Sequence, residues 1–164
     1  MQFQRRDGIV NTNGTPPEVG TKFPEFTIKN KNNQKLTLKQ LLDKLTLISV
    51  VPDINTRVCS ISTQRFNHEM DNYSQFNFYT ISTNEPEDQQ NWCAAEGVSN
   101  MELLSDAEFD FGKKAGIFIA ANKTDARCIY ILDTDGTILY RELINPQNNE
   151  PNYQAALEFL NSQA

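Results

Sequence analysis

The stretch Pro52-Asp53-Ile54-Asn55-Thr56-Arg57-Val58-Cys59 marks the expected passage from a buried strand into a helix. Residues 45–51 before it form a short apolar run rich in β-branched side chains, which predicts a strand that ends at Pro52. After it, apolar side chains recur at helical spacing, and Thr56 stands where a helix N-cap is expected. Cys59 is therefore predicted to lie in the first turn of a helix.

This position would favour the thiolate form of Cys59, because unpaired backbone N–H groups and the helix dipole are positive there. Lowering a cysteine pKa from about 8.5 to about 6 takes roughly 3.4 kcal/mol. A helix terminus supplies ~2 kcal/mol at best, so we expect an arginine from elsewhere in the fold to supply the remainder. From the residues alone, an inert cysteine buried behind the strand is an equally good interpretation.

Short motifs in a fixed order extend this pattern along nearly the whole chain. Pro52, Thr56 and Cys59 are spaced as Pro-x-x-x-Thr-x-x-Cys. Further motifs lie at residues 49–52, 63–67, 92–93, 104–106, 111–112 and 126–127. The first motif resembles the peroxidatic motif of peroxiredoxins. The whole set resembles the thiol peroxidases, the atypical two-cysteine peroxiredoxins in which both cysteines belong to one chain.

The resemblance implies a single thioredoxin-like α/β domain over residues 1–164, with an N-terminal β-hairpin. It also implies an antioxidant, thiol-dependent peroxidase that reduces hydrogen peroxide and alkyl hydroperoxides. Cys59 would become a sulfenic acid, and Cys93 would resolve it as an intramolecular disulfide. A thioredoxin-like dithiol protein would then recycle the enzyme, which is expected to be a homodimer. No metal, flavin or haem is implied.

The same resemblance assigns the other site residues. Arg127 would be the cation that contacts the sulfur and the peroxide oxygens. Thr56 would hold the peroxide in line, and Pro52 would shield the thiolate from water. The residues alone do not separate Arg127 from Arg57 or Arg65, and they allow Thr56 to be a helix cap only.

Two features differ from the family pattern. Asp53 and Asn55 stand where thiol peroxidases usually carry serine and aspartate, and the segment 85–91 before Trp92-Cys93 is acidic. A carboxylate at Asp53 would raise the pKa of a neighbouring thiolate unless it points to solvent. The rival hypotheses are a non-catalytic redox sensor or binding module that uses the same cysteine switch, and a degenerate member that keeps only the fold. Without the resemblance, Cys93 could equally be a small core residue.

The composition excludes several other classes. A net charge of −6 and a pI near 4.8 argue against nucleic acid and anionic membranes as partners. No apolar stretch is long enough to span a membrane, and no secretory signal is recognisable, so we expect a cytoplasmic protein. The three cysteines form no Cys-x-x-Cys pair, and His68, expected at the surface, is the single histidine, which argues against a metal site. Cys128 is expected to be buried and inert.

Hydrophobic periodicity and turn signals predict the remaining elements. Asp7-Gly8 and Asn13-Gly14 predict a hairpin around Ile9-Val10. Strands are expected around residues 26–28, 36–38, 76–82, 102–104, 127–132 and 137–141. Helices are expected after residue 38, from residue 84 through Cys93, near residues 109–116, and over residues 153–160.

Overall fold

The computed structural model describes residues 1–55, 68, 75–96 and 102–163. The expected helix that carries Thr56 and Cys59 lies outside these residues. His68 is exposed, as predicted. Within the described part of the chain, no helix is long and apolar enough to cross a membrane.

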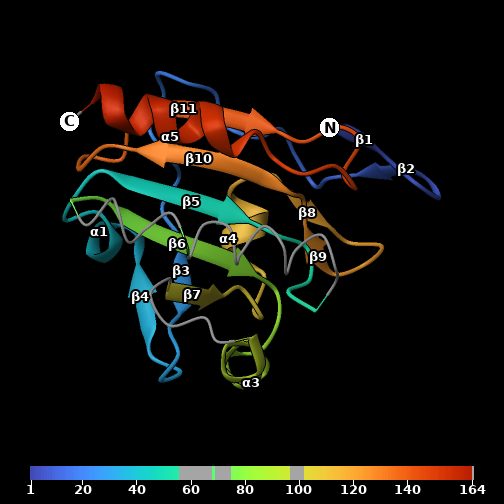
Figure 1. The fold of residues 1–164 in the computed structure, drawn as a ribbon. Helices are drawn as coiled ribbons and strands as arrows, with labels where there is room; N and C mark the ends of the chain where they lie inside the picture. The colour runs from blue at the N-terminus through green and yellow to red at the C-terminus, as the bar shows by residue number, and fades with distance from the viewer. Residues whose placement is uncertain (56–67, 69–74, 97–101, 164) are drawn as a thin grey trace.

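A mixed seven-stranded sheet forms the centre of the fold (Figure 1). Its strands, in spatial order, are β11 (Ile138–Leu143), β10 (Cys128–Leu132), β5 (Thr46–Val50), β6 (Asn77–Ser82), β7 (Glu102–Ser105), β3 (Thr27–Lys29) and β4 (Lys35–Thr37). Strands β5, β6 and β7 run parallel, as the predicted βαβ unit requires, and the other neighbours are antiparallel. Every predicted strand of this sheet is confirmed.

Successive residues of the central strands pack into different cores, which follows from the two-residue period of a strand. In β10, Cys128, Tyr130 and Leu132 pack into one core, whereas Ile129 and Ile131 pack into the other. The continuous apolar sequence of β10 is explained by this burial on both faces.

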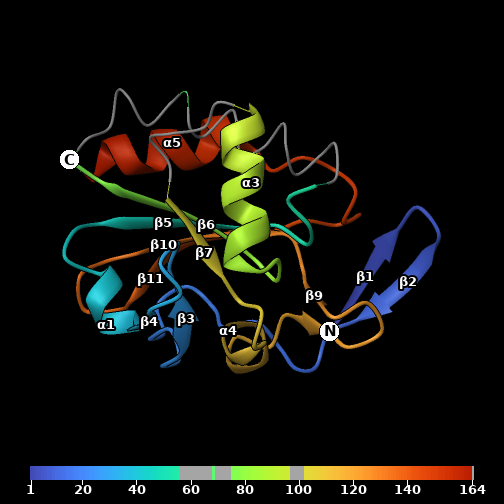
Figure 2. The same cartoon turned by 90° about the horizontal axis from the view of Figure 1, so that it is seen from below.

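Helices cover both faces of the sheet. Figure 2 shows α3 (Pro86–Glu96) and α5 (Tyr153–Ser162) on one side, with α1 (Leu38–Leu41) and α4 (Asp110–Lys114) on the other. The apolar stripe of α5, which predicted this helix, is buried against the sheet. Glu87 and Asp88 lie in the first turn of α3, where their charge complements the helix dipole.

Two small hairpins lie at the edge of the molecule near the N-terminus. β1 (Gln2–Arg5) pairs with β2 (Gly8–Asn11), which confirms the predicted N-terminal hairpin. Arg6 and Asp7 form its two-residue turn, and Gly8 has a φ of 136°, a value accessible to glycine. β8 (Phe118–Ile119) pairs with β9 (Thr124–Asp125), a hairpin too short to have been predicted.

Candidate active site

Arg127 lies directly before β10 and is almost fully buried, with 4% of its surface exposed. Its backbone N–H donates to Oε1 of Gln147 at 2.5 Å, and its Nε donates to the backbone oxygen of Gln147 at 2.9 Å. The Gln147 amide nitrogen in turn donates to the backbone oxygens of Arg127, at 3.1 Å, and Ile144, at 2.6 Å. One glutamine thus fixes both the backbone and the side-chain direction of this arginine.

The same glutamine joins the arginine to the N-terminal hairpin. The backbone N–H of Gln147 donates to the Gln4 oxygen at 2.7 Å, and the Gln4 N–H donates to Oδ1 of Asn145 at 2.9 Å. Strand β1 is therefore tied to residues 145–147. The predicted hairpin, to which the sequence assigned no chemistry, supports the segment that holds Arg127.

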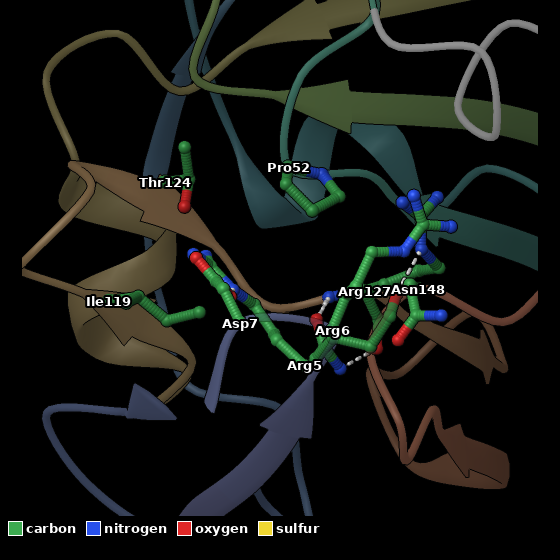
Figure 3. A pocket seen from close by; sticks show the side chains of 9 residues that line it. Arg5, Arg6, Asp7, Pro52, Ile119, Thr124, Arg127 and Asn148 are labelled. Carbon is green, nitrogen blue, oxygen red and sulfur yellow. Dashed lines mark hydrogen bonds and ion pairs between the residues drawn. The ribbon is translucent and has the colours of Figure 1, made fainter. Parts of the chain in front are cut away.

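A pocket of about 450 Å³ opens beside Arg127 (Figure 3). Among the described residues, its lining consists of Arg5, Arg6, Asp7, Pro52, Ile119, Thr124, Arg127, Gln147 and Asn148. The pocket thus brings together two of the predicted site residues, Pro52 and Arg127, which are 75 positions apart. It is large enough for a small organic molecule as well as for a peroxide.

The loop after β5 is held by Asp53, one of the two residues that differ from the family pattern. Its Oδ1 accepts from the backbone N–H of Asn55 and from Nδ2 of Asn84, both at 3.0 Å. Asn84 also accepts from the backbone N–H of Ile54 at 2.9 Å. The Asp53 carboxylate therefore shapes the loop after Pro52. The sequence alone suggested either a carboxylate that raises the pKa of a nearby thiolate or a side chain that points to solvent.

Cys93 is half-buried on α3, as the predicted helix places it. It packs against the core that contains Trp92, and this burial raises the pKa of its thiol. Gln89, one turn earlier, is fully buried and donates to Ser82 Oγ and to the Leu104 oxygen, both at 2.9 Å. These bonds anchor α3 to strands β6 and β7.

Cys128 lies on the opposite side of the sheet from Cys93. It is fully buried in the core formed with Tyr130 and Leu132, and this burial raises the pKa of its thiol. The two cysteines belong to separate cores, so the sheet stands between them. The expectation that Cys128 is buried is confirmed.

Asp106 and Asp125 form a second buried polar cluster, next in the chain to the one around Arg127 and Gln147. Asp106 accepts from the backbone N–H groups of Phe111 and Gly112, both at 2.9 Å. Asp125 lies against it with no exposed surface, and no N–H or hydroxyl of the described residues donates to its oxygens. Burial, followed by the contact with Asp106, raises the pKa of Asp125 well above its usual range. Burial and the neighbouring Asp106 carboxyl group therefore both oppose a negative charge on Asp125.

Thr56 and Cys59, with Arg57 and Arg65, lie outside the described residues, so their predicted roles are still predictions. Within the described part of the chain, no group of three or more histidine, cysteine, aspartate or glutamate side chains could hold a metal ion. The site that the structure shows is the pocket with Pro52 and Arg127 and the nearby hydrogen-bonded scaffold.

Comparison with known proteins decides the family. Residues 19–141 match the AhpC/TSA family. The chain belongs to this family. It is 36% identical over 154 residues to the thiol peroxidase of Bacillus subtilis, covering 93% of this chain and 92% of that protein. It is 40% identical over 146 residues to the thiol peroxidase of Listeria innocua, covering 88% of each chain.

Comparison with solved structures agrees with this family assignment. A peroxiredoxin-like protein from Aquifex aeolicus superposes with a TM-score of 0.92 and 25% identity, covering 99% of this chain and 97% of that one. A thiol peroxidase from Chromobacterium violaceum superposes with a TM-score of 0.89 at 17% identity, covering the same shares, which shows the common fold. The predicted family, peroxiredoxin fold and enzyme class, a peroxiredoxin-type thiol peroxidase, are confirmed.

The sequence did not reveal the residues that support the site. Gln147 lies in a turn-rich segment, Gln89 is one of several polar residues on α3, and Asp125 resembles a loop aspartate. The one signal available was that Asp106 belongs to a family motif, which suggested that its surroundings matter but named no partner.

Proposed function

We propose that this AhpC/TSA-family protein reduces hydrogen peroxide and alkyl hydroperoxides through Cys59 and Cys93. The observation that carries the proposal is the Arg127 guanidinium, fixed by Gln147 at a pocket that Pro52 also lines. A rigidly held guanidinium is suited to stabilising a thiolate and the charge that develops on a departing oxygen. The match of this arrangement to the predicted site residues supports a peroxidase site.

In the proposed reaction, the Cys59 thiolate attacks one peroxide oxygen, a sulfur–oxygen bond forms, and the oxygen–oxygen bond breaks. The other oxygen leaves with a proton as water or alcohol. The Cys93 sulfur then attacks the Cys59 sulfenic acid, which forms a disulfide and releases water. Cys93 must give up its proton in this step, and burial, which raises the pKa of its thiol, opposes that loss. A thioredoxin-like dithiol would reduce the disulfide.

Intact mass and disulfide mapping test this cycle on the fully reduced protein after one equivalent of peroxide. We expect the loss of two hydrogens and a Cys59–Cys93 link. Cys93→Ser should instead retain one added oxygen at Cys59, whereas Cys128→Ala, the control, should form the same link as the unmodified chain. A link that involves Cys128, or no oxidation at Cys59, would contradict the proposal.

Turnover separates the enzyme from the redox sensor. With thioredoxin and its reductase present, a peroxidase consumes many equivalents of peroxide, whereas a sensor is oxidised once and recycled poorly. The predicted homodimer is a further proposal, which sedimentation of the reduced and oxidised protein would test.

A further inference from the structure

The pocket beside Arg127 is basic, although the chain as a whole is acidic. Its described lining contains three arginines and one aspartate, in a protein with a net charge of −6. The aspartate is already paired, because Asp7 accepts from Nε and Nη2 of Arg5 at 3.2 and 3.1 Å. An anion entering the pocket would therefore meet positive charge that no carboxylate of the described lining neutralises.

Arg6 is the arginine best placed to meet such an anion. It is exposed in the two-residue turn of the β1–β2 hairpin, and no hydrogen bond or ion pair joins it to another described residue. Figure 3 shows the Arg5–Asp7 pair on the side of the pocket near Thr124 and Ile119, with Arg6 and Arg127 on the other side. Arg5 is occupied by Asp7, whereas the Arg6 fork is open to bind a carboxylate through two N–H groups.

The rest of the lining can accommodate a carbon skeleton. Pro52 and Ile119 offer apolar surface, and the volume of about 450 Å³ exceeds what hydrogen peroxide needs. We propose that this pocket selects organic hydroperoxides that carry a carboxylate, and that Arg6 is a specificity-determining residue. The inference rests on the proposed function, because the peroxide group of such a substrate must reach the site that Pro52 and Arg127 border.

Charge selection is tested with two compounds that share one carbon skeleton and differ in charge. We would compare para-carboxylated cumene hydroperoxide with its methyl ester as substrates of the full chain, with thioredoxin and its reductase. We expect a higher kcat/KM for the acid, and Arg6→Gln should lower the acid-to-ester ratio about three- to fivefold, as for one exposed ion pair. Raising the salt concentration should reduce the ratio of the unmodified chain in the same direction.

Lys31→Gln is the matched control, because it removes the same charge from an exposed residue of the turn between β3 and β4, outside the pocket lining. It should leave the acid-to-ester ratio as in the unmodified chain. A ratio that Arg6→Gln does not change, or that both variants lower equally, would overturn the assignment of Arg6.

A binding measurement separates this inference from the proposed function. The unreactive analogue para-isopropylbenzoate should bind the protein more tightly than its methyl ester, and Arg6→Gln should lower that preference about three- to fivefold in calorimetry. If neither hydroperoxide is turned over but this preference is found, the proposed activity fails and the anion site stands. If the analogue shows no preference that depends on Arg6, the site fails whatever the activity.

Discussion

The segment from Asp125 to Arg127 carries two buried polar clusters that handle burial differently. At one end, each polar atom that Gln147 presents to Arg127 has a partner, in bonds of 2.5 to 3.1 Å. At the other end, two carboxyl groups face each other, and the oxygens of Asp125 receive no hydrogen bond from any described N–H or hydroxyl. The first cluster keeps its charge in the interior, whereas the second must take up a proton.

This difference separates the Arg127 guanidinium, which must stay charged for the proposed chemistry, from the Asp125 carboxyl group, which need not be charged. A buried guanidinium is retained at a site when its environment is made of fixed dipoles, and the amide and backbone oxygen of Gln147 are such dipoles. The buried pair of carboxyl groups connects β9 to the loop before α4, and burial there opposes a second negative charge two residues from Arg127. We therefore propose a chemical role for the first cluster and a structural role for the second.

The largest expected effect comes from changing Gly112, which lies between the two carboxyl groups. A Cβ at this position would lie 2.6 Å from Cγ of Asp125, closer still to its Oδ1, and 3.1 Å from Oδ2 of Asp106. Gly112→Ala within a helix would ordinarily stabilise it by up to about 1 kcal/mol. Here we expect urea unfolding to show a loss of about 3 kcal/mol, since overpacking a buried site outweighs helix propensity.

A double-mutant cycle shows whether the loss arises from the carboxyl pair. In an Asp125→Ala background the clash with Asp125 is absent, so Gly112→Ala should cost much less than it does alone. Equal costs in the two backgrounds would mean that the close approach of Gly112 to Asp125 does not determine stability.

A smaller loss is expected when the arginine cluster is broken. Gln147→Leu removes the acceptor for the Arg127 N–H and the donor for the Ile144 oxygen, and both groups are buried. We expect a loss of about 2 kcal/mol in the free energy of unfolding and a lower kcat/KM for peroxide. The control is Gln154→Leu, which removes one exposed bond to Glu158 and should cost less than about 0.5 kcal/mol. Similar losses in the two variants would argue against a specific role for Gln147.

The two clusters also show how far the sequence could lead. The strands and helices were predicted because their signals are local, such as the β-branched run 45–51, the apolar stripe of α5 and the Asp-Gly turn between β10 and β11. The family motifs named Arg127 and Pro52 as partners, and the structure places both at one pocket. Spacing alone could not choose Arg127 over Arg57 or Arg65.

Long-range contacts explain what was missed. Gln147 meets Arg127 across 20 residues and Gln4 across more than 140, through backbone atoms whose positions no residue pattern specifies. Asp125 looks like one more polar residue of a loop, and it is burial in the folded chain that sets it apart. Sequence reasoning therefore found the groups that carry the proposed chemistry better than it found the groups that hold them.

Replacing Asp125 by asparagine, its neutral analogue, should have the smallest effect on the free energy of unfolding at any single mildly acidic pH. The effect is visible as a changed slope of stability against pH. Because the pKa of Asp125 is raised in the folded protein, the unfolded chain loses this proton first as the pH rises above about 4. The folded protein keeps the proton until its own higher pKa, so this group lowers stability as the pH rises through that window. Asp125→Asn should remove that loss, by no more than about 1.4 kcal/mol per pH unit for one proton.

Asp110→Asn provides a control of opposite sign. The backbone N–H of Thr27 donates to Asp110 at 2.8 Å and lowers the pKa of that carboxyl. Its contribution to stability is present above the unfolded pKa and is lost as the pH falls through the folded one. Relative to the unmodified chain, urea unfolding from about pH 2 to pH 7 should therefore find Asp110→Asn losing stability as the pH rises to about 4, and Asp125→Asn gaining stability as the pH rises above about 4. If Asp125→Asn gains no stability above about pH 4, the pKa of Asp125 is not raised in the folded protein, and the two buried clusters differ less than their geometry indicates.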